Sequence, residues 1–528
     1  MDTRYLEPFL FADGMRRADT ATIERYQIPA DLLMETAGRE AARVIATRHG
    51  PLAEKHLVVV AGKGNNGGDG FVVARAIFEA CRHVTVVHVQ DRESGSAEAI
   101  ANLERLERMA READNLTLLP AGELPPPAPP PDLIVDAVLG VGTSGPIREP
   151  ASKLVAWIRD QACPVIALDV PSGLDSDSGR TTEGAVIADL TVSFGALKPG
   201  TFTMDGPDHS GEVQVVDIGL AVQAVRSEIE TGHGGWRLTD AFARATLPAR
   251  KHGAHKFSAG KVVCICGSLA FPGAAVLSAR AASAAGAGYV QVVLPESARH
   301  LTQAHLIEQM TLGMPATAEG TLSMDALEDV LDLISDADSV VLGCGLGKDP
   351  ETATLVRQIV RRSEVPMVID ADGLNALVGH TGLLQSSRPE RFVLTPHLGE
   401  FQRLVDREDV ADPFTAVSDA AREWGVTVLL KGSPTLVSEN GNRLFAAASA
   451  PPALATAGTG DVLSGMTAGL MAQGLAPVAA ALCALHVGSR CAEAFSRDHH
   501  APSMVASDLF DLAPRMLATL NLYPRKER

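Results

Sequence analysis

The chain is poor in cysteine, with only seven cysteines among 528 residues, and no two of them form a CxxC pair. This scarcity excludes a metal or redox site built on such pairs. An odd number of scattered cysteines also argues against a disulfide framework, since disulfides persist in oxidising compartments. We therefore expect a protein of the reducing cytoplasm.

Positive charge is also scarce. The chain has 46 Lys and Arg against 64 Asp and Glu, which gives a formal net charge of −18 at pH 7. Proteins that bind polyanions regardless of sequence gain affinity by neutralising phosphates with Lys and Arg, so no nucleic-acid partner is expected. Small phosphorylated ligands stay open, because helix N-termini and glycine loops bind anions locally.

A long uninterrupted apolar run is missing as well. The longest apolar region, residues 462–487, contains Gln473, Pro477 and several glycines, which predicts two buried helices and no membrane span. The N-terminal segment MDTRYLEPFLFADG has acidic residues where a secretory signal needs basic ones. We expect neither a signal peptide nor membrane association.

Length and periodicity indicate the fold class. A chain of 528 residues can bury more than one core, because single cores stop growing at about 250 to 300 residues. Strand-like and helix-like patterns alternate, as in the strand 56–62, the helix 71–80 and the strand 84–89. This alternation predicts an α/β protein with two doubly wound domains, whose parallel sheets carry helices on both faces.

A polar stretch at residues 227–235 separates the strand pattern at 213–220 from a new series that begins at 260. We therefore place one domain at residues 1–222, a linker at 223–239 and a second domain at 240–528.

The first candidate site centres on residues 63–70, KGNNGGDG, between an apolar strand and a helix. Glycines let the backbone approach a ligand, and a helix N-terminus favours phosphate. Two more strand ends carry polar groups, Asp136 with the loop 140–146 and Asp169 with Ser172. Because ligands bind at the carboxyl ends of parallel strands, the three segments are predicted to converge. Alternatively, the loops only turn strand into helix and Asp169 caps an element.

Five motifs follow one another in this half: LMETAG (33–38), GNNGGDG (64–70), DAVLGVG (136–142), DVPSGLD (169–175) and FGALKPG (194–200). Together, over about residues 8–220, they resemble the NAD(P)H-hydrate epimerase family. The resemblance implies a Rossmann-like three-layer domain that interconverts the R and S forms of hydrated NADH and NADPH, NADHX and NADPHX, at C6.

The resemblance also implies roles for individual residues. Potassium would be held by Asn66, Asp136 and Ser172, whose oxygens suit a hard cation. Asp169 would be the acid or base of epimerisation. Lys198 would handle a proton or contact phosphate, unless it is a solvated lysine before a turn. The hydrated nucleotide would contact Asn65, Asn66, Gly67, Gly68, Asp69, Gly140, Val141, Gly142, Thr143, Ser144, Gly145, Pro146 and Asp169.

The second candidate site is AGTGD, residues 457–461, at the start of a predicted helix. Such a loop presents N–H groups that form an anion hole, with Asp461 beside the bound phosphate. A carboxylate placed there can act as base toward a hydroxyl in phosphoryl transfer. Upstream, the strand, turn and strand of residues 426–437 offer Lys431 and Thr435 to nucleotide phosphates. Taken alone, this turn could equally be an ordinary hairpin.

Several motifs accompany this loop: HK (255–256), GSLAFPGAAVLSARAA (267–282), AGAGYVQV (285–292), LGCGLG (342–347), DADGLNAL (370–377), LTPHLGE (394–400) and KGSPT (431–435). Over about residues 240–518 they resemble the ADP-dependent NAD(P)H-hydrate dehydratases of the ribokinase-like superfamily. The resemblance implies a second three-layer domain that converts S-NAD(P)HX to NAD(P)H with ADP and Mg²⁺, releasing AMP and phosphate.

Carried over by position, Asp461 would activate the C6 hydroxyl. The hydrated nucleotide would contact Ala274, Gly345, His397 and Asp461, and ADP would contact Lys431, Gly432, Ser433, Pro434, Thr435 and Gly460. Phe257 and Cys344 depart from the family pattern, which usually has glycine and proline there.

Two other functions are compatible with the sequence. Ribokinase-like domains also include vitamin-precursor kinases, which would release a phosphorylated product. Epimerase-like domains also resemble modules of RNA-decapping scaffolds, although this chain is acidic and keeps Asp169. With NADHX, NADPHX and ADP as expected ligands, we also expect a homo-oligomer.

Overall fold

The computed structural model describes residues 2–89, 95–121, 129–142, 145–250, 252–385 and 391–520. The chain divides into two compact units. The N-terminal unit is Pro8–Gly235, and the C-terminal unit is Trp236–Arg528 together with Met1–Glu7. Each unit has a mainly parallel sheet with helices on both faces, so the predicted α/β class with two doubly wound domains is confirmed.

The sheet of the N-terminal unit is parallel throughout, in the order β4-β3-β2-β5-β6-β7-β8. Its central strands are uninterrupted runs of buried residues, as expected when helices cover both faces. The order reverses direction between β2 and β5, and ligands bind at such a switch point. The strands are β2 (His56–Ala61), β3 (His83–His88), β4 (Leu116–Pro120), β5 (Leu133–Ala137), β6 (Val165–Leu168), β7 (Leu190–Phe194) and β8 (Glu212–Val216).

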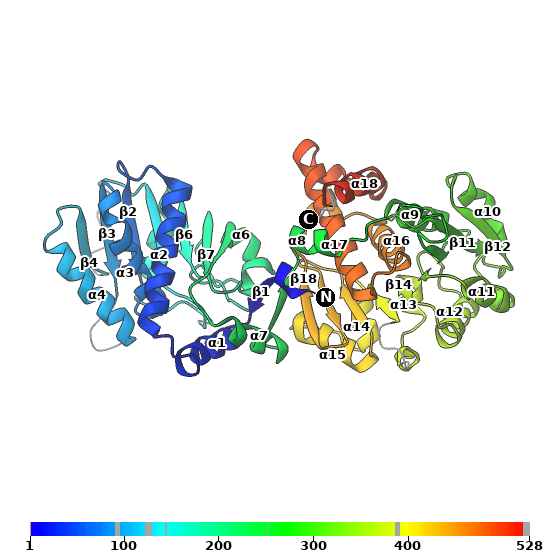
Figure 1. Cartoon of the computed structure of the whole chain (residues 1–528), viewed down its shortest axis with the longest axis horizontal. Coiled ribbons are helices and arrows are strands. Elements are labelled where there is room, and N and C mark those ends of the chain that lie inside the picture. The colour runs from blue at the N-terminus through cyan, green and yellow to red at the C-terminus, as the bar shows by residue number, and fades with distance from the viewer. Residues whose placement is uncertain are drawn as a thin grey trace. The chain divides into compact units, whose positions relative to one another are not determined.

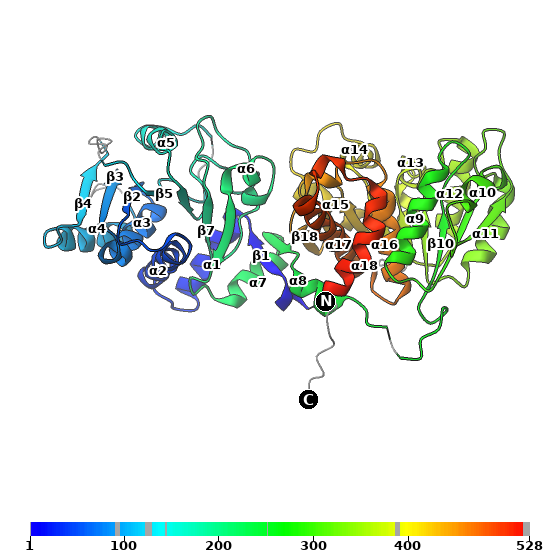
Figure 2. The ribbon, with the colours of Figure 1, turned by 90° about the horizontal axis from the view of Figure 1, so that it is seen from above.

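Helices α2, α3 and α4 cover one face of this sheet and α5 covers the other (Figure 2). The helices of the unit are α1 (Ala12–Glu24), α2 (Ala30–His49), α3 (Asn65–Ile77), α4 (Ala97–Ala110), α5 (Ala151–Arg159), α6 (Gly206–Ser210) and α7 (Val222–Glu230).

The segment 223–239, expected to be a linker, instead contains α7 and the strand β9 (Gly234–Arg237). Helix α7 packs on α1 and buries Ala224, Val225 and Ile229. The amphipathic spacing of these apolar residues explains the difference, because it gives an otherwise polar stretch one face to bury. The two units therefore divide between Gly235 and Trp236.

Helix α3 also begins earlier than its predicted start at residue 71, because the glycine motif forms its first two turns. A Cβ on Gly67 would collide with the carbonyl oxygen of Gly62, and one on Gly70 would lie 2.7 Å from Cβ of Ala137. These glycines therefore bring α3 close to the strand ends, a packing role that was not predicted from the sequence.

The sheet of the C-terminal unit runs, from β9, in the order β9-β18-β17-β16-β15-β14-β13-β10-β11-β12. Strand β17 pairs antiparallel with both neighbours, and the other pairs are parallel. The switch point lies between β10 and β13. The strands are β10 (Lys261–Ile265), β11 (Tyr289–Pro295), β12 (Met310–Met314), β13 (Ser339–Leu342), β14 (Met367–Ile369), β15 (Phe392–Leu394), β16 (Thr427–Leu430), β17 (Leu436–Glu439) and β18 (Arg443–Ala446).

Helices α9, α16 and α17 lie on one face of this sheet, and α11, α12 and α15 lie on the other (Figure 1). The helices are α8 (Asp240–Thr246), α9 (Pro272–Ala284), α10 (Glu296–Gln303), α11 (Leu327–Ile334), α12 (Pro350–Arg362), α13 (Asp372–Asn375), α14 (Leu398–Val405), α15 (Pro413–Trp424), α16 (Thr459–Ala472), α17 (Pro477–Asp498) and α18 (Leu509–Leu520).

The apolar region 462–487 forms α16 and the first half of α17, so the prediction of two buried helices is confirmed. By length and composition alone, α17 could cross a membrane, but 78% of its most apolar window is buried inside the unit. Such burial is typical of a core helix.

The close packing of α3 gives a stability prediction. Replacing Gly67 with Ala should lower the free energy of unfolding of the N-terminal unit by about 1 to 3 kcal/mol, because the added methyl group overpacks the contact with Gly62. Native-state hydrogen exchange of the α3 amides measures this. Gly64→Ala is the matched control, since a Cβ there meets nothing within 4 Å. Equal destabilisation by both variants would contradict the packing role.

Candidate functional site

A cavity of about 730 Å³ in the N-terminal unit lies at the switch point of its sheet, against residues that follow β2 and β5. Among the predicted contacts, those that line it are Asn65, Asn66, Asp69, Gly140, Val141 and Asp169. Those that are described but do not line it are Gly67, Gly68, Gly142, Gly145 and Pro146. Thr143 and Ser144 lie outside the described residues.

A buried polar cluster lies behind this cavity and contains the three residues predicted to hold potassium. The hydroxyl of Ser172 donates to the Asp136 carboxylate at 2.7 Å, and its backbone N–H donates to the other carboxylate oxygen at 2.8 Å. Ser172 Oγ also accepts from the backbone N–H of Leu139 at 2.8 Å. Asn66 donates through its amide to the carbonyl oxygen of the same Leu139, at 2.8 Å. One loop residue therefore connects all three.

The chemistry of this cluster suits a cation. Asn66 Oδ1 is buried without a hydrogen-bond partner, so this carbonyl oxygen is available to coordinate a cation. Burial raises the pKa of Asp136 to about 6, despite the hydrogen bonds from Ser172 and Val138, so its carboxylate is ionised but uncompensated at neutral pH. Amide, carboxylate and hydroxyl oxygens together are ligands that a hard cation prefers.

Asp169 lies at the carboxyl end of β6 and forms an ion pair with Lys198. The lysine side chain is fully buried, and its ammonium also donates to the carbonyl oxygen of Phe194 at 2.7 Å. The alternative of a solvated lysine is therefore wrong. Asp169 has a φ of +68°, a strained value for a residue with a side chain. The backbone N–H of Phe194 donates to its carboxylate at 3.1 Å, which helps to hold it in place.

A second carboxylate, Asp69 on α3, faces the same cavity. Burial, followed by the negative charges of Asp169 and Asp19, raises the pKa of Asp69 well above its ordinary value, although Lys198 opposes the shift. One cavity thus contains an aspartate in an ion pair and an aspartate that favours its protonated form. Two carboxyl groups so differentiated can divide the roles of base and acid.

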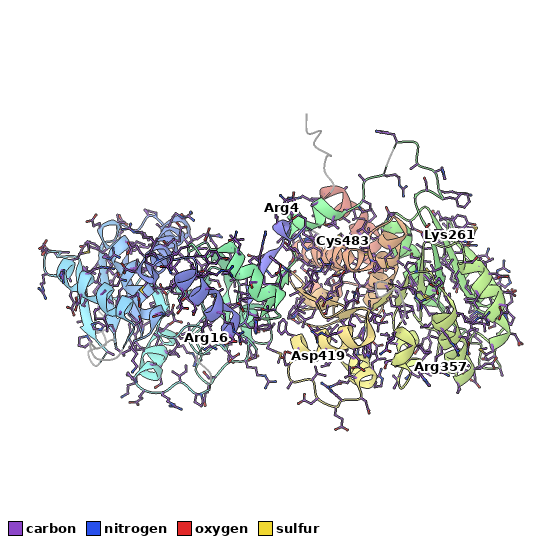
Figure 3. All side chains as sticks on the ribbon, turned by 60° about the horizontal axis from the view of Figure 1, so that its bottom comes forward. Arg4, Arg16, Lys261, Arg357, Asp419 and Cys483 are labelled. Atoms are coloured by element: carbon purple, nitrogen blue, oxygen red, sulfur yellow. The ribbon has the colours of Figure 1, made fainter. Side chains whose placement is uncertain are left out.

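Sequence reasoning missed the contribution of α1, which supplies Met15, Arg16 and Asp19 to the cavity wall. Arg16 is labelled in Figure 3. Helix α1 precedes the sheet, so strand-end reasoning does not reach it. The available signal was the spacing of Arg16 and Asp19, three residues apart and hence on one helix face. Arg148, from the segment before α5, also lines the cavity.

The C-terminal unit has a cavity of about 530 Å³ at the N-terminus of α16. Of the predicted ADP contacts, Lys431, Gly432, Ser433, Thr435 and Gly460 line it, and Pro434 does not. Apolar side chains form much of the remaining wall, namely Pro451, Pro452, Leu454, Val462, Leu463, Met466, Leu485 and Leu509. A phosphate-binding end and an apolar end together suit a nucleotide.

Asp461 occupies the first turn of α16. Burial, followed by the charge of Asp370, raises its pKa to about 6, while Cys344 and Lys431 oppose the shift. A carboxyl group with this pKa is ionised at neutral pH and is a stronger base than an ordinary aspartate.

The other predicted contacts of the hydrated nucleotide are Ala274, Gly345 and His397. Ala274 and Gly345 lie near the switch point of the C-terminal sheet, and His397 lies beside Lys431 at the end of β16. Gly345 has a φ of +67°, and a Cβ there would lie 2.7 Å from Cβ of Ala274, so these two residues adjoin. His397 caps α14 through its ring, accepting from the backbone N–H of Glu400 at 3.3 Å, and stays more than half exposed. The two residues that depart from the family pattern differ in burial: Phe257 is exposed and Cys344 is fully buried.

Models of known families match both parts of the chain. Residues 30–200 match the model described as YjeF-related protein N-terminus, and residues 262–515 match the model described as NAD(P)H-hydrate dehydratase. Each match lies within one of the two units.

Known proteins match the chain over almost its full length. A bifunctional NAD(P)H-hydrate repair enzyme of Salinibacter ruber is 43% identical over 521 residues, covering 97% of this chain and 96% of that protein. One of Moorella thermoacetica is 35% identical over 533 residues, covering 96% of each. A crystal structure of ADP/ATP-dependent NAD(P)H-hydrate dehydratase from Bacillus subtilis, with ATP and Mg²⁺, is 26% identical, covers 53% of this chain and 97% of that one, and has a TM-score of 0.45.

The buried ion pair of the first site gives a second stability prediction. Lys198→Met should destabilise the N-terminal unit by about 3 kcal/mol, because it leaves the Asp169 carboxylate without its partner. Adding Asp169→Asn to that variant should restore most of the loss, since no unpaired charge then remains. Urea unfolding of the full chain measures both. Additive losses in the double variant would argue against a coupled pair.

Proposed function

The chain belongs to the family of bifunctional NAD(P)H-hydrate repair enzymes, and on that premise we propose which residues carry its two activities. The enzyme repairs hydrated NADH and NADPH: one activity interconverts the R and S forms, and the other dehydrates the hydrated nucleotide to NAD(P)H. We assign epimerisation to the N-terminal cavity and dehydration to the C-terminal one. The observation that carries this assignment is that each unit has its own cavity beside an aspartate. Asp69 and Asp169 line the cavity of the N-terminal unit. Gly460, which directly precedes Asp461, lines the cavity of the C-terminal unit.

In the epimerase site, Asp169 and Asp69 act on the hydroxyl at C6 of the hydrated ring. Protonated Asp69 donates its proton to that hydroxyl, the C6–O bond breaks, and the lone pair of N1 forms a C=N bond as water leaves. Water then adds to the opposite face of C6, and the Asp169 carboxylate takes its proton. Lys198 supports the base by holding its carboxylate in one position. One proton is given to the substrate and one is taken from it, and return of the proton from Asp169 to Asp69 restores the enzyme for the next cycle.

Potassium would be held beside this site by Asn66, Asp136 and Ser172. When bound, it supplies positive charge that compensates the buried carboxylate and fixes the loop around Leu139. The cavity wall formed by Gly140 and Val141 continues from this loop, so the cluster positions the substrate and takes no proton itself.

In the dehydratase site, ADP occupies the cavity lined by Lys431, Gly432, Ser433, Thr435 and Gly460. Asp461 takes the proton of the C6 hydroxyl, whose oxygen attacks the β-phosphorus of ADP, and the bond to AMP breaks. Phosphate then leaves C6, pushed by the N1 lone pair, and loss of a proton from C5 completes NAD(P)H. Magnesium would accompany the ADP phosphates, since such sites bind it largely through phosphate oxygens.

Separate sites predict separable losses. Asp461→Asn should lower dehydration of S-NADPHX by at least about 10³-fold and leave epimerisation intact, because the asparagine cannot accept the proton. Asp169→Asn should do the reverse. Both are measured by the return of reduced-nicotinamide absorbance after adding ADP, magnesium and potassium to mixed epimers, corrected for spontaneous epimerisation. Simultaneous loss of both activities in either variant would contradict independent sites. Phosphorylation of a vitamin precursor without this return would favour a kinase instead.

Potassium should stabilise the N-terminal unit in a pH-dependent way. The raised pKa of Asp136 means that the folded unit loses stability as pH rises from about 4 through about 6, because the buried carboxylate then ionises. Potassium should offset this loss, so exchanging choline chloride for potassium chloride should raise the unfolding temperature at pH 8 and much less at pH 5. Equal increases at both values would argue against a cation on Asp136.

A further inference from the structure

Next to Asp461, the C-terminal unit contains an ion pair between Asp370, which is buried, and Lys431, which is partly exposed. Asp370 takes no part in the dehydration steps proposed for this site. Asp370 follows β14 directly, and its carboxylate accepts from the Lys431 ammonium at 2.8 Å. The other carboxylate oxygen accepts from the hydroxyl of Ser464 at 2.7 Å, one turn after Asp461 on α16. The backbone N–H of Ala371 donates at 2.8 Å. With three donors and 1% exposure, Asp370 is a fixed buried anion.

The lysine of this pair lies at the nucleotide cavity. Lys431 follows β16, and its backbone N–H donates to the carbonyl oxygen of Pro396 at 2.8 Å, which anchors its main chain. A Cβ on Gly460 would lie 3.2 Å from the Lys431 ammonium and 3.5 Å from Asp370 Oδ2. The ammonium therefore adjoins the first turn of α16, where a helix N-terminus favours phosphate.

From this geometry we propose that Asp370 is a positioning residue of the dehydratase, which fixes the Lys431 ammonium against the phosphates of ADP and strengthens Asp461 as a base through its negative charge. The inference rests on the proposed dehydration at this site. In this role Asp370 contacts neither ADP nor the hydrated nucleotide, and it acts through Lys431 and Asp461, which do.

The charges around Asp461 support the second half of this role. Asp370 and Asp372 raise its pKa, whereas Lys431 and Cys344 lower it, and Asp370 is the strongest of these after burial itself. Burial raises the pKa of Asp370, but the charge and hydrogen bond of Lys431, together with the hydrogen bonds from Ser464 and Ala371, keep it below the ordinary value, so Asp370 stays ionised. The same pairing raises the pKa of Lys431 despite its burial, so both members remain charged.

The position of Asp370 is also built by its backbone. Ala371 has a φ of +50°, which a residue with a side chain rarely adopts, and Gly343 packs so closely that a Cβ there would collide with the carbonyl oxygen of Asp370. Ser464 is fully buried and directs its hydroxyl to Asp370. A merely space-filling aspartate would not need these restraints.

The test is the pH dependence of dehydration of S-NADPHX by the full chain, at saturating and at limiting ADP. In the wild type, kcat should fall below about pH 6 as Asp461 becomes protonated. This fall of kcat at low pH is the acidic limb of the profile. Asp370→Asn should move the acidic limb to lower pH by about one unit, because a like charge no longer raises the pKa of Asp461. It should also raise the KM for ADP by about tenfold or more, because Lys431 loses its charged partner.

Two further variants separate this role from a general structural one. Lys431→Met should move the acidic limb in the opposite direction, to higher pH, since it removes the positive charge that offsets Asp370. Ser464→Ala removes one hydrogen bond from Asp370 but no charge, so its limb should stay at the wild-type position. Epimerase activity of the same chains reports whether the remainder of each preparation is intact.

Opposite shifts in Asp370→Asn and Lys431→Met would support the proposal. An unshifted limb in Asp370→Asn would overturn it, as would a KM for ADP equal to that of the wild type. If Asp370→Asn does not fold, the upward shift of Lys431→Met decides, and its absence overturns the proposal. A wild-type chain that does not restore NADPH would overturn the proposed function and this inference together, whereas an active wild type with unshifted variants overturns the inference alone.

Discussion

Both sites depend on one constraint, the need to keep an ionised aspartate inside the protein. In the N-terminal unit Asp169 follows β6 and pairs with Lys198, and in the C-terminal unit Asp370 follows β14 and pairs with Lys431. A buried carboxylate without a partner would take up a proton or destabilise the fold by several kcal/mol. Each lysine comes from the end of another strand, so parallel sheet topology makes both pairs possible.

The two units use their pairs differently. In the epimerase unit the paired aspartate itself faces the cavity, and Asp69, whose pKa is raised mainly by burial, is on α3. In the dehydratase unit the paired aspartate is buried behind the site, and its charge acts on Asp461 at the start of α16. In both units, a paired aspartate lies close to a second carboxyl group whose pKa is raised, and a raised pKa suits proton transfer at neutral pH.

Glycines contribute to both sites indirectly, because they let helices pack closely against neighbouring backbone. The motif that suggests a phosphate loop in the sequence forms the first turns of α3, where Gly67 and Gly70 allow the helix to touch the strands. That contact places Asn66 and Asp69 about one turn apart on α3. Both line the cavity, and the Asn66 amide also donates to the carbonyl oxygen of Leu139. In α16, Gly465 and Gly469 similarly bring the helix against the backbone of α9.

The sequence by itself determined the fold class, the two-domain organisation, the two apolar helices near residue 470 and the family, because apolar periodicity and ordered motifs are local properties of the chain. It also identified six of the residues that line the N-terminal cavity and five of those that line the C-terminal one. Only the tertiary structure decided that α7 belongs to the N-terminal unit, that α1 supplies Arg16 and Asp19, and that Lys198 is buried. It likewise showed that His397 caps a helix and that Asp370 lies between Lys431 and Ser464. These features depend on contacts between residues far apart in the chain or on the burial of a polar side chain. The spacing of neighbouring residues encodes neither long-range contacts nor burial.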